Sequence, residues 1–263
     1  MNKLALIPFL FASVVAQASV PSALDVMKKN EAARRVTDTV ADATLETKTG
    51  DKNTLKKFTW WRRLNPDAVH YNTLTRFRDP SEVRGEGILF LERNADENEV
   101  LMYLPSFKKT RRVESQAQSG SFMGSAFSYS DIATPHVDDY AYKMLREETC
   151  PDGSKVQCWV IEATPSSDAV KERIGATRVV QWIRQDCYMV ARSESFDGDQ
   201  AFKQMQASET KEVDPMKHTW MSHHLEMKDL KSNRATTLQF AAVKVNQGVA
   251  ENTFTPQNLT KEH

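Results

Sequence analysis

Short runs rich in aromatic and β-branched residues follow one another along most of the chain, and turn residues such as Asn65-Pro66-Asp67 separate them. Runs of this length and spacing predict β-strands joined by hairpins. About a dozen can be marked: 55–64, 69–78, 87–92, 100–104, 108–114, 140–148, 156–163, 177–184, 188–196, 201–212, 218–227 and 236–245. The pattern therefore predicts a mainly β protein, built as an antiparallel sheet or barrel.

Helical signals are few. A serine N-cap predicts a helix over residues 22–34, and Ser166 or Ser167 can cap a short second helix that ends at Ile174. Residues 129–133 are expected to form a turn or two of helix. Helices therefore cover only a small part of the predicted sheet.

Two of the predicted strands are apolar on both faces. Residues 88–91 and 100–104 show no polar alternation, whereas residues 218–227 alternate, with Met221 and Met227 on the same face. A strand that is apolar on both faces is covered on both faces. The apolar faces are read either as ordinary core or as the lining of a ligand cavity, because methionine adapts to irregular partners.

The segment SGSFMGSAFSYSD, residues 119–131, is the best candidate for one of these covers. It is too interrupted by glycine and serine for a strand, and too apolar for a solvated loop. We hypothesise a lid in which Gly120 and Gly124 supply the bends while Phe122, Met123 and Phe127 face a cavity. The alternative is a fixed loop that seals the core and never moves.

The first eighteen residues have the three parts of a secretory signal peptide. Lys3 gives a positive start, residues 4–15 are apolar, and Ala16-Gln17-Ala18 predicts cleavage after Ala18. Residues 19–263 contain neither a long linker nor a repeat and are expected to form a single domain in a bacterial periplasm. With 35 basic and 35 acidic side chains, no net charge attracts the chain to nucleic acid.

Three cysteines are present. Cys150 and Cys158 flank a Pro-Asp-Gly turn between two predicted strands, and in an oxidising compartment they are expected to form a disulfide across that hairpin. Cys187 is left over as a buried or half-buried thiol. A cysteine metal or redox site is disfavoured, because the Cys-x-x-Cys spacing is missing.

No motif for catalysis stands out. His223 and His224 are adjacent on a predicted strand, so their side chains point to opposite faces and do not favour a shared metal ion. The sequence has no nucleophile elbow, zinc-protease motif or phosphate-binding loop. We therefore expect neither an enzyme, nor a metal, nor another cofactor.

Four stretches carry motifs that occur together in one family, and their most specific part is the Ser-Phe-Met-Gly-Ser-x-Phe block. They are Arg76-Phe77-Arg78 with Pro80 and Val83-Arg84-Gly85; Leu101 to Pro105 with Lys108-Lys109 and Arg111-Arg112; Ser121 to Tyr129; and Val245-Asn246 with Phe254-Thr255 and Leu259. The chain thereby resembles the bacterial outer-membrane lipoprotein-sorting proteins, a branch of the LolA/LolB-like carrier superfamily. It departs from that family at Ala126 and Ser130, where acidic residues are common.

The resemblance implies a curved, incomplete antiparallel barrel of about eleven strands, with a few short helices plugging the open side. It implies an apolar half-barrel cavity that takes acyl chains of a lipid or lipoprotein and moves them toward the outer membrane. It also implies a partner, an inner-membrane exporter of the resistance-nodulation-division (RND) type, and a monomeric protein. The alternative function is an accessory subunit that docks on an exporter and carries nothing.

The predicted cavity and lid are lined by aromatic and methionine side chains. The candidates are Phe77, Phe90, Met102, Phe122, Met123, Phe127, Tyr142, Met144, Trp182 and Met221. Arg111 and Arg112 are interpreted as solvated strand ends, with contact to lipid head groups as the alternative.

Overall fold

The protein is described here by a computed structural model that covers residues 21–93 and 98–261. The predicted signal peptide, with its cleavage site after Ala18, lies outside the described residues. Within them, no helix combines the length and the apolar character needed to cross a bilayer.

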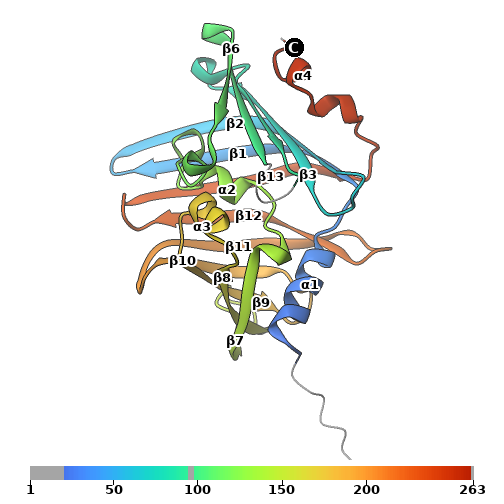
Figure 1. Ribbon diagram of the computed structural model, residues 1–263, viewed down its shortest axis with the longest axis vertical. Coiled ribbons are helices and arrows are strands. Elements are labelled where there is room, and N and C mark those ends of the chain that lie inside the picture. The colour runs from blue at the N-terminus through green and yellow to red at the C-terminus, as the bar shows by residue number, and fades with distance from the viewer. Residues whose placement is uncertain (1–20, 94–97, 262–263) are drawn as a thin grey trace, which may run out of the picture.

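Thirteen antiparallel strands of the described chain form one curved sheet that is not closed (Figure 1). They are β1 (Asp38–Thr49), β2 (Lys52–Leu64), β3 (Tyr71–Asp79), β4 (Gly87–Leu91), β5 (Glu99–Leu104), β6 (Lys109–Val113), β7 (Tyr140–Thr149), β8 (Gln157–Pro165), β9 (Arg178–Arg184), β10 (Val190–Asp197), β11 (Gln200–Asp214), β12 (Thr219–Asp229) and β13 (Arg234–Val245). The predicted incomplete barrel is confirmed, with thirteen strands in place of about eleven.

The strand order explains where the barrel is open. It runs β6-β5-β4-β3-β2-β1-β13-β12-β11-β10-β9-β8-β7, so β6 and β7 are the two edges. These edges are consecutive in the sequence, and residues 114–139 join them. This crossing segment lies in front of the sheet, and it contains α2 (Figure 1). Chain connectivity alone therefore places residues 119–131 at the open side.

The sequence patterns did not predict β1, although it is central and pairs with both β2 and β13. Its buried face carries Ala41, Ala43 and Leu45, each 1% exposed. These side chains are mostly small, and they alternate with polar residues that lie on the other face. The strand therefore lacks the aromatic and β-branched bulk by which the other strands were found.

Short helices complete the chain. The α-helices are α1 (Ala23–Ala33), α2 (Tyr129–Ile132), α3 (Asp168–Ile174) and α4 (Pro256–Leu259), and the 3-10 helices are η1 (Ser81–Val83), η2 (Pro105–Phe107), η3 (Ser115–Ala117), η4 (Phe122–Gly124), η5 (Val137–Asp139) and η6 (Glu251–Phe254). Ser22, Ser128 and Ser167 cap α1, α2 and α3 by accepting a backbone N–H near the start of each. The three predicted helical regions are confirmed.

The strands that are apolar on both faces are covered on both faces. Ile88 and Phe90 of β4 pack in the same core cluster as Phe122 of the crossing segment. Leu89, between them, packs on the opposite face with Leu259 of α4. The second cover is therefore the C-terminal segment, which the sequence did not indicate.

The predicted disulfide is present. Cys150 and Cys158 are joined across the β7–β8 turn, with their Cα atoms 5.1 Å apart, and both are buried. The remaining cysteine, Cys187, is a buried free thiol whose pKa is raised, chiefly by burial.

We expect replacement of Cys150 and Cys158 by alanine to lower the free energy of unfolding by about 2–3 kcal/mol. The reason is that the unfolded chain regains the freedom of a short closed loop. Urea unfolding of the two proteins measures the difference. Replacing Cys187 alone by alanine is the control, and it should leave the response to a reducing agent unchanged. Equal stability of the wild-type protein with and without reductant would contradict the expectation.

Candidate binding cavity

A cavity of about 330 Å³ lies between the concave face of the sheet, α1 and the crossing segment. Its lining is mostly apolar, and it includes Met27, Trp60, Phe127, Tyr142, Met189, Met205, Met221, Leu225 and Met227. Met205 and Ala207 face it from β11, because alternate residues of a strand point to one side. Cavities of this size and character are typical of sites for small apolar ligands.

Three of the predicted site residues line this cavity: Phe127, Tyr142 and Met221. The sequence could not separate them from their neighbours, because alternation marks the inward face of a strand but not where that face is hollow. The methionines at positions 27, 189, 205 and 227 also line the cavity, and they were not among the predicted residues.

The other candidates belong to packed clusters. Phe77, Phe90 and Phe122 are buried in the core beneath the crossing segment, and Met102 and Met123 pack against them. Met144 and Tyr142 pack against a second cluster, formed by α1 with β8 and β9.

Trp182 lies on the opposite face of β9 from Val179 and Gln181, which line the cavity. It packs with Cys150 and Cys158 on the far side of the sheet, and its indole N–H donates to Glu148 at 2.5 Å. We therefore remove Trp182 from the proposed cavity. The error arose because alternation groups Val180 with Trp182 but does not say which face of the sheet they share.

Residues 119–131 fold back on themselves as a compact loop. The amide of Phe122 donates to the carbonyl oxygen of Phe127 at 2.7 Å, and the amide of Tyr129 donates to the carbonyl oxygen of Gly120 at 3.2 Å. Phe122 is fully buried, with its ring centre 6.3 Å from that of Phe58, 6.1 Å from that of Phe77 and 5.7 Å from that of Tyr129. The apolar character of this segment therefore comes from a ring that enters the core.

The same loop is tied to three strands. Lys56 of β2 donates to the carbonyl of Met123 at 2.9 Å, and the amide of Ala126 donates to the hydroxyl of Thr236 on β13 at 2.8 Å. Asp131, at its end, pairs with Lys203 of β11 at 2.7 Å. These contacts hold the loop across the concave face.

Local backbone geometry explains why glycine occupies both positions 120 and 124. A Cβ at Gly120 would lie 2.9 Å from the carbonyl oxygen of Ala117, which is closer than real contacts allow. Gly124 has φ +78°, in the left-handed region that favours glycine. The proposed hinge role of these residues stays a prediction.

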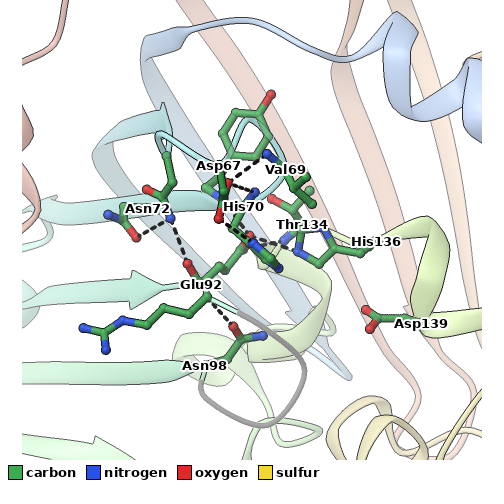
Figure 2. A network of polar contacts seen from close by, with 12 residues as sticks. Asp67, Val69, His70, Asn72, Glu92, Asn98, Thr134, His136 and Asp139 are labelled. Carbon is green, nitrogen blue, oxygen red and sulfur yellow. Dashed lines mark hydrogen bonds and ion pairs between the residues drawn. The ribbon is translucent and has the colours of Figure 1, made fainter.

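A buried carboxylate fastens the far end of the crossing segment. Glu92, which follows β4 and is 2% exposed, accepts the amide of Thr134 at 2.7 Å and that of Tyr71 at 3.2 Å. Figure 2 shows His136 and His70 beside it; His136 Nε2 lies 3.4 Å from a Glu92 oxygen, and the two imidazole centres are 4.7 Å apart. No sequence pattern indicated this network, because Glu92 is 21 positions from Tyr71 and 42 positions from Thr134 along the chain.

We expect Glu92→Gln to lower the free energy of unfolding by about 1–3 kcal/mol. The two backbone N–H groups donate to different carboxylate oxygens, and an NH2 group in place of one oxygen leaves one buried donor unpaired. Urea unfolding measures the loss. Glu114→Gln, at a carboxylate whose side chain is 71% exposed, is the matched control and should change stability little. Equal effects from the two changes would contradict the role assigned to Glu92.

Charged and phenolic side chains also line part of the cavity. They are Arg34, Arg62, Asp131, His136, Tyr140, Tyr142 and Lys203. Burial raises the pKa of Tyr140 and of Tyr142, so both phenols stay neutral and can donate hydrogen bonds. The lining of the cavity is thus amphipathic, because these polar side chains accompany the methionines and other apolar residues.

His218, His223 and His224 do not converge. His218 contacts Glu212 at 2.9 Å, while His224 contacts Gln239 at 2.6 Å. Over residues 21–93 and 98–261, no three histidine, cysteine or acidic side chains are grouped so as to hold a metal ion.

Three solved structures share this fold over nearly their whole length. A domain described as an outer membrane lipoprotein-sorting protein, from Vibrio parahaemolyticus, is 22% identical and has a TM-score of 0.83, with 91% of this chain and 98% of that one covered. A DUF1329 family protein from Desulfovibrio piger is 22% identical with a TM-score of 0.82, covering 90% and 97%. A LolA superfamily protein from Nitrosomonas europaea is 18% identical with a TM-score of 0.70, covering 91% and 100%.

The chain therefore has the same fold as a domain described as an outer membrane lipoprotein-sorting protein and as a LolA superfamily protein. No curated protein sequence matches the chain. A family model described as "Uncharacterized protein" matches residues 70–261, most of the chain. The chain belongs to that family, and its fold is the LolA-like fold.

Proposed function

We propose that this protein is a periplasmic carrier that holds acyl chains of a lipid or lipoprotein in the cavity and moves them toward the outer membrane. The observation that carries the proposal is the cavity of about 330 Å³, lined by methionine and aromatic side chains inside an unclosed sheet. A barrel whose interior was completely filled would have favoured the alternative, a docking subunit that carries nothing.

The physical basis of such binding is the transfer of methylene groups out of water. Each buried methylene gains about 0.8 kcal/mol, so even part of an acyl chain supplies useful affinity. Met205, Met221 and Met227 suit this task because their unbranched side chains adapt to chains of different shape. These methionines can therefore accommodate acyl chains of different length and shape, which suits a carrier of one lipid class with variable tails.

The location and the partners follow from the same proposal. The predicted signal peptide supports export to the periplasm, and the two similar structures described as sorting or LolA superfamily proteins support carriage of lipid or lipoprotein cargo. We propose an RND-type exporter as the inner-membrane partner and a monomer as the carrying form. The resemblance in the sequence motifs supports the exporter.

Native mass spectrometry of the protein purified from periplasm without detergent tests the proposal. We expect a bound species with the mass of a phospholipid, another polar lipid or an acylated peptide. A mass equal to that of the apoprotein, together with failure to take up a fluorescent fatty acid, would overturn the carrier function and leave the docking subunit.

A further inference from the structure

Two arginines are among the polar residues that line the cavity. Arg34 follows the C-terminus of α1, and Arg62 lies on β2; both line the cavity. The pKa of Arg34 is lowered, first by burial and then by the positive charge of Arg62. In the described part of the chain, neither guanidinium has a carboxylate within 4.0 Å. Like charges held together in a partly buried place are unfavourable unless an anion joins them.

The contacts of the pair leave most of its N–H groups free. Arg62 donates to the hydroxyl of Thr134 at 2.9 Å and stacks 3.6 Å over the ring of Tyr71, while its Nε is buried with no hydrogen-bond partner among the described residues. Arg34 donates from Nε to the carbonyl of Asn30 at 3.3 Å. A guanidinium has five N–H donors, so both arginines keep several for a ligand.

Neighbouring charges do not neutralise the pair. Lys203 is already paired with Asp131 at 2.7 Å. The carboxylate of Glu31 raises the pKa of Arg34, but it pairs with Arg35 at 3.4 Å. The imidazole of His136, which also lines the cavity, lies 3.4 Å from Glu92. The arginines are therefore the source of excess positive charge in the cavity. The neutral phenols of Tyr140 and Tyr142 line the same cavity and add two O–H donors.

We propose that Arg34 and Arg62 bind a phosphate head group of an amphiphile whose acyl chain lies among the methionines of the cavity. Two guanidiniums match the double negative charge of a phosphate monoester better than the single charge of a carboxylate, and they bind its oxygens in parallel pairs. This inference rests on the proposed carrier function and names the class of its cargo as amphiphiles that carry a phosphate monoester.

Titration of the purified, delipidated protein with dodecyl phosphate, dodecan-1-ol and inorganic phosphate tests the assignment. The two amphiphiles share one chain, so their difference reports the head group alone. We expect the wild-type protein to bind dodecyl phosphate at least about tenfold more tightly than dodecan-1-ol, since charge-assisted hydrogen bonds are the strong ones. Inorganic phosphate should bind far more weakly than dodecyl phosphate.

The variant Arg34→Gln with Arg62→Gln should lose that preference while still binding dodecan-1-ol as the wild type does, and this retained binding reports an intact cavity. Arg111→Gln with Arg112→Gln is the matched control, because it removes the same charge from exposed positions of β6, outside the cavity lining. It should keep the preference. If the glutamine variant fails to fold, Arg34→Lys with Arg62→Lys retains both charges and should keep part of the preference.

Each other outcome overturns a distinct claim. Equal binding of the two amphiphiles by the wild type would overturn the head-group site and leave the carrier function standing. Binding of neither amphiphile would overturn the carrier function as well. Inorganic phosphate binding as tightly as dodecyl phosphate, without any binding of dodecan-1-ol, would indicate a site for free phosphate and overturn the lipid assignment.

Discussion

Phe122→Ala is expected to lower the free energy of unfolding by about 3–5 kcal/mol, the usual cost of emptying a fully buried aromatic site. The ring is 0% exposed and meets Phe58, Phe77 and Tyr129. Its loss removes the main apolar anchor of the loop that joins the two halves of the sheet. Urea unfolding of the wild type and the variant measures the change.

Phe107→Ala is the matched control, because the same ring is removed from a position that is 65% exposed. It should change stability by no more than about 0.5 kcal/mol. A loss below about 1 kcal/mol at Phe122 would mean that its site collapses without cost or that the loop leaves the core readily. A large loss is expected if residues 119–131 form a fixed seal, whereas a small loss would favour the mobile lid.

The strand pattern was predictable because most strands carry bulky side chains and are bounded by turn residues. Twelve of the thirteen described strands fall on a predicted run, and β1 does not. Its inward alanines pack beneath larger side chains of neighbouring strands, so its burial is set by those neighbours and not by its own hydrophobicity. Tertiary packing of this kind overrides local propensity.

The candidate site was less predictable than the fold. Tyr142 and Met221 were selected by alternation along a strand, and Phe127 by the apolar character of residues 119–131. Trp182 was misplaced because alternation does not say which face is inward. The polar residues of the lining were missed for another reason. Arg34 and Arg62 are 28 positions apart, on a helix end and a strand, and no local pattern distinguishes them from solvated arginines.

The crossing segment links the fold to the proposed function. Because β6 and β7 do not pair, residues 114–139 must cover the open side, and the way they cover it decides how much space remains beneath. Phe122 fills the half of the interior lined by β2–β4, while Phe127 and Asp131 border the cavity on the other half. One segment thus closes part of the half-barrel and leaves the rest available for a ligand.

Ala207→Trp is expected to weaken the binding of an acyl chain by at least about 100-fold while the protein still folds. Ala207 lies on β11, is 3% exposed and lines the cavity of about 330 Å³, so an indole there takes up space needed by the ligand. Displacing about four methylene groups into water costs roughly 3 kcal/mol, which corresponds to that factor. Displacement of a fluorescent fatty acid measures the affinity.

The matched control is Ala141→Trp, because Ala141 is exposed on the edge strand β7 and does not line the cavity. It adds the same indole and should leave affinity unchanged. The unfolding transition of the Ala207→Trp protein shows whether the ring is accommodated, and an empty cavity provides room that a packed core would not. If that variant folds and binds the fatty acid as the wild type does, the chain lies elsewhere, and the carrier would have to hold its cargo outside this cavity.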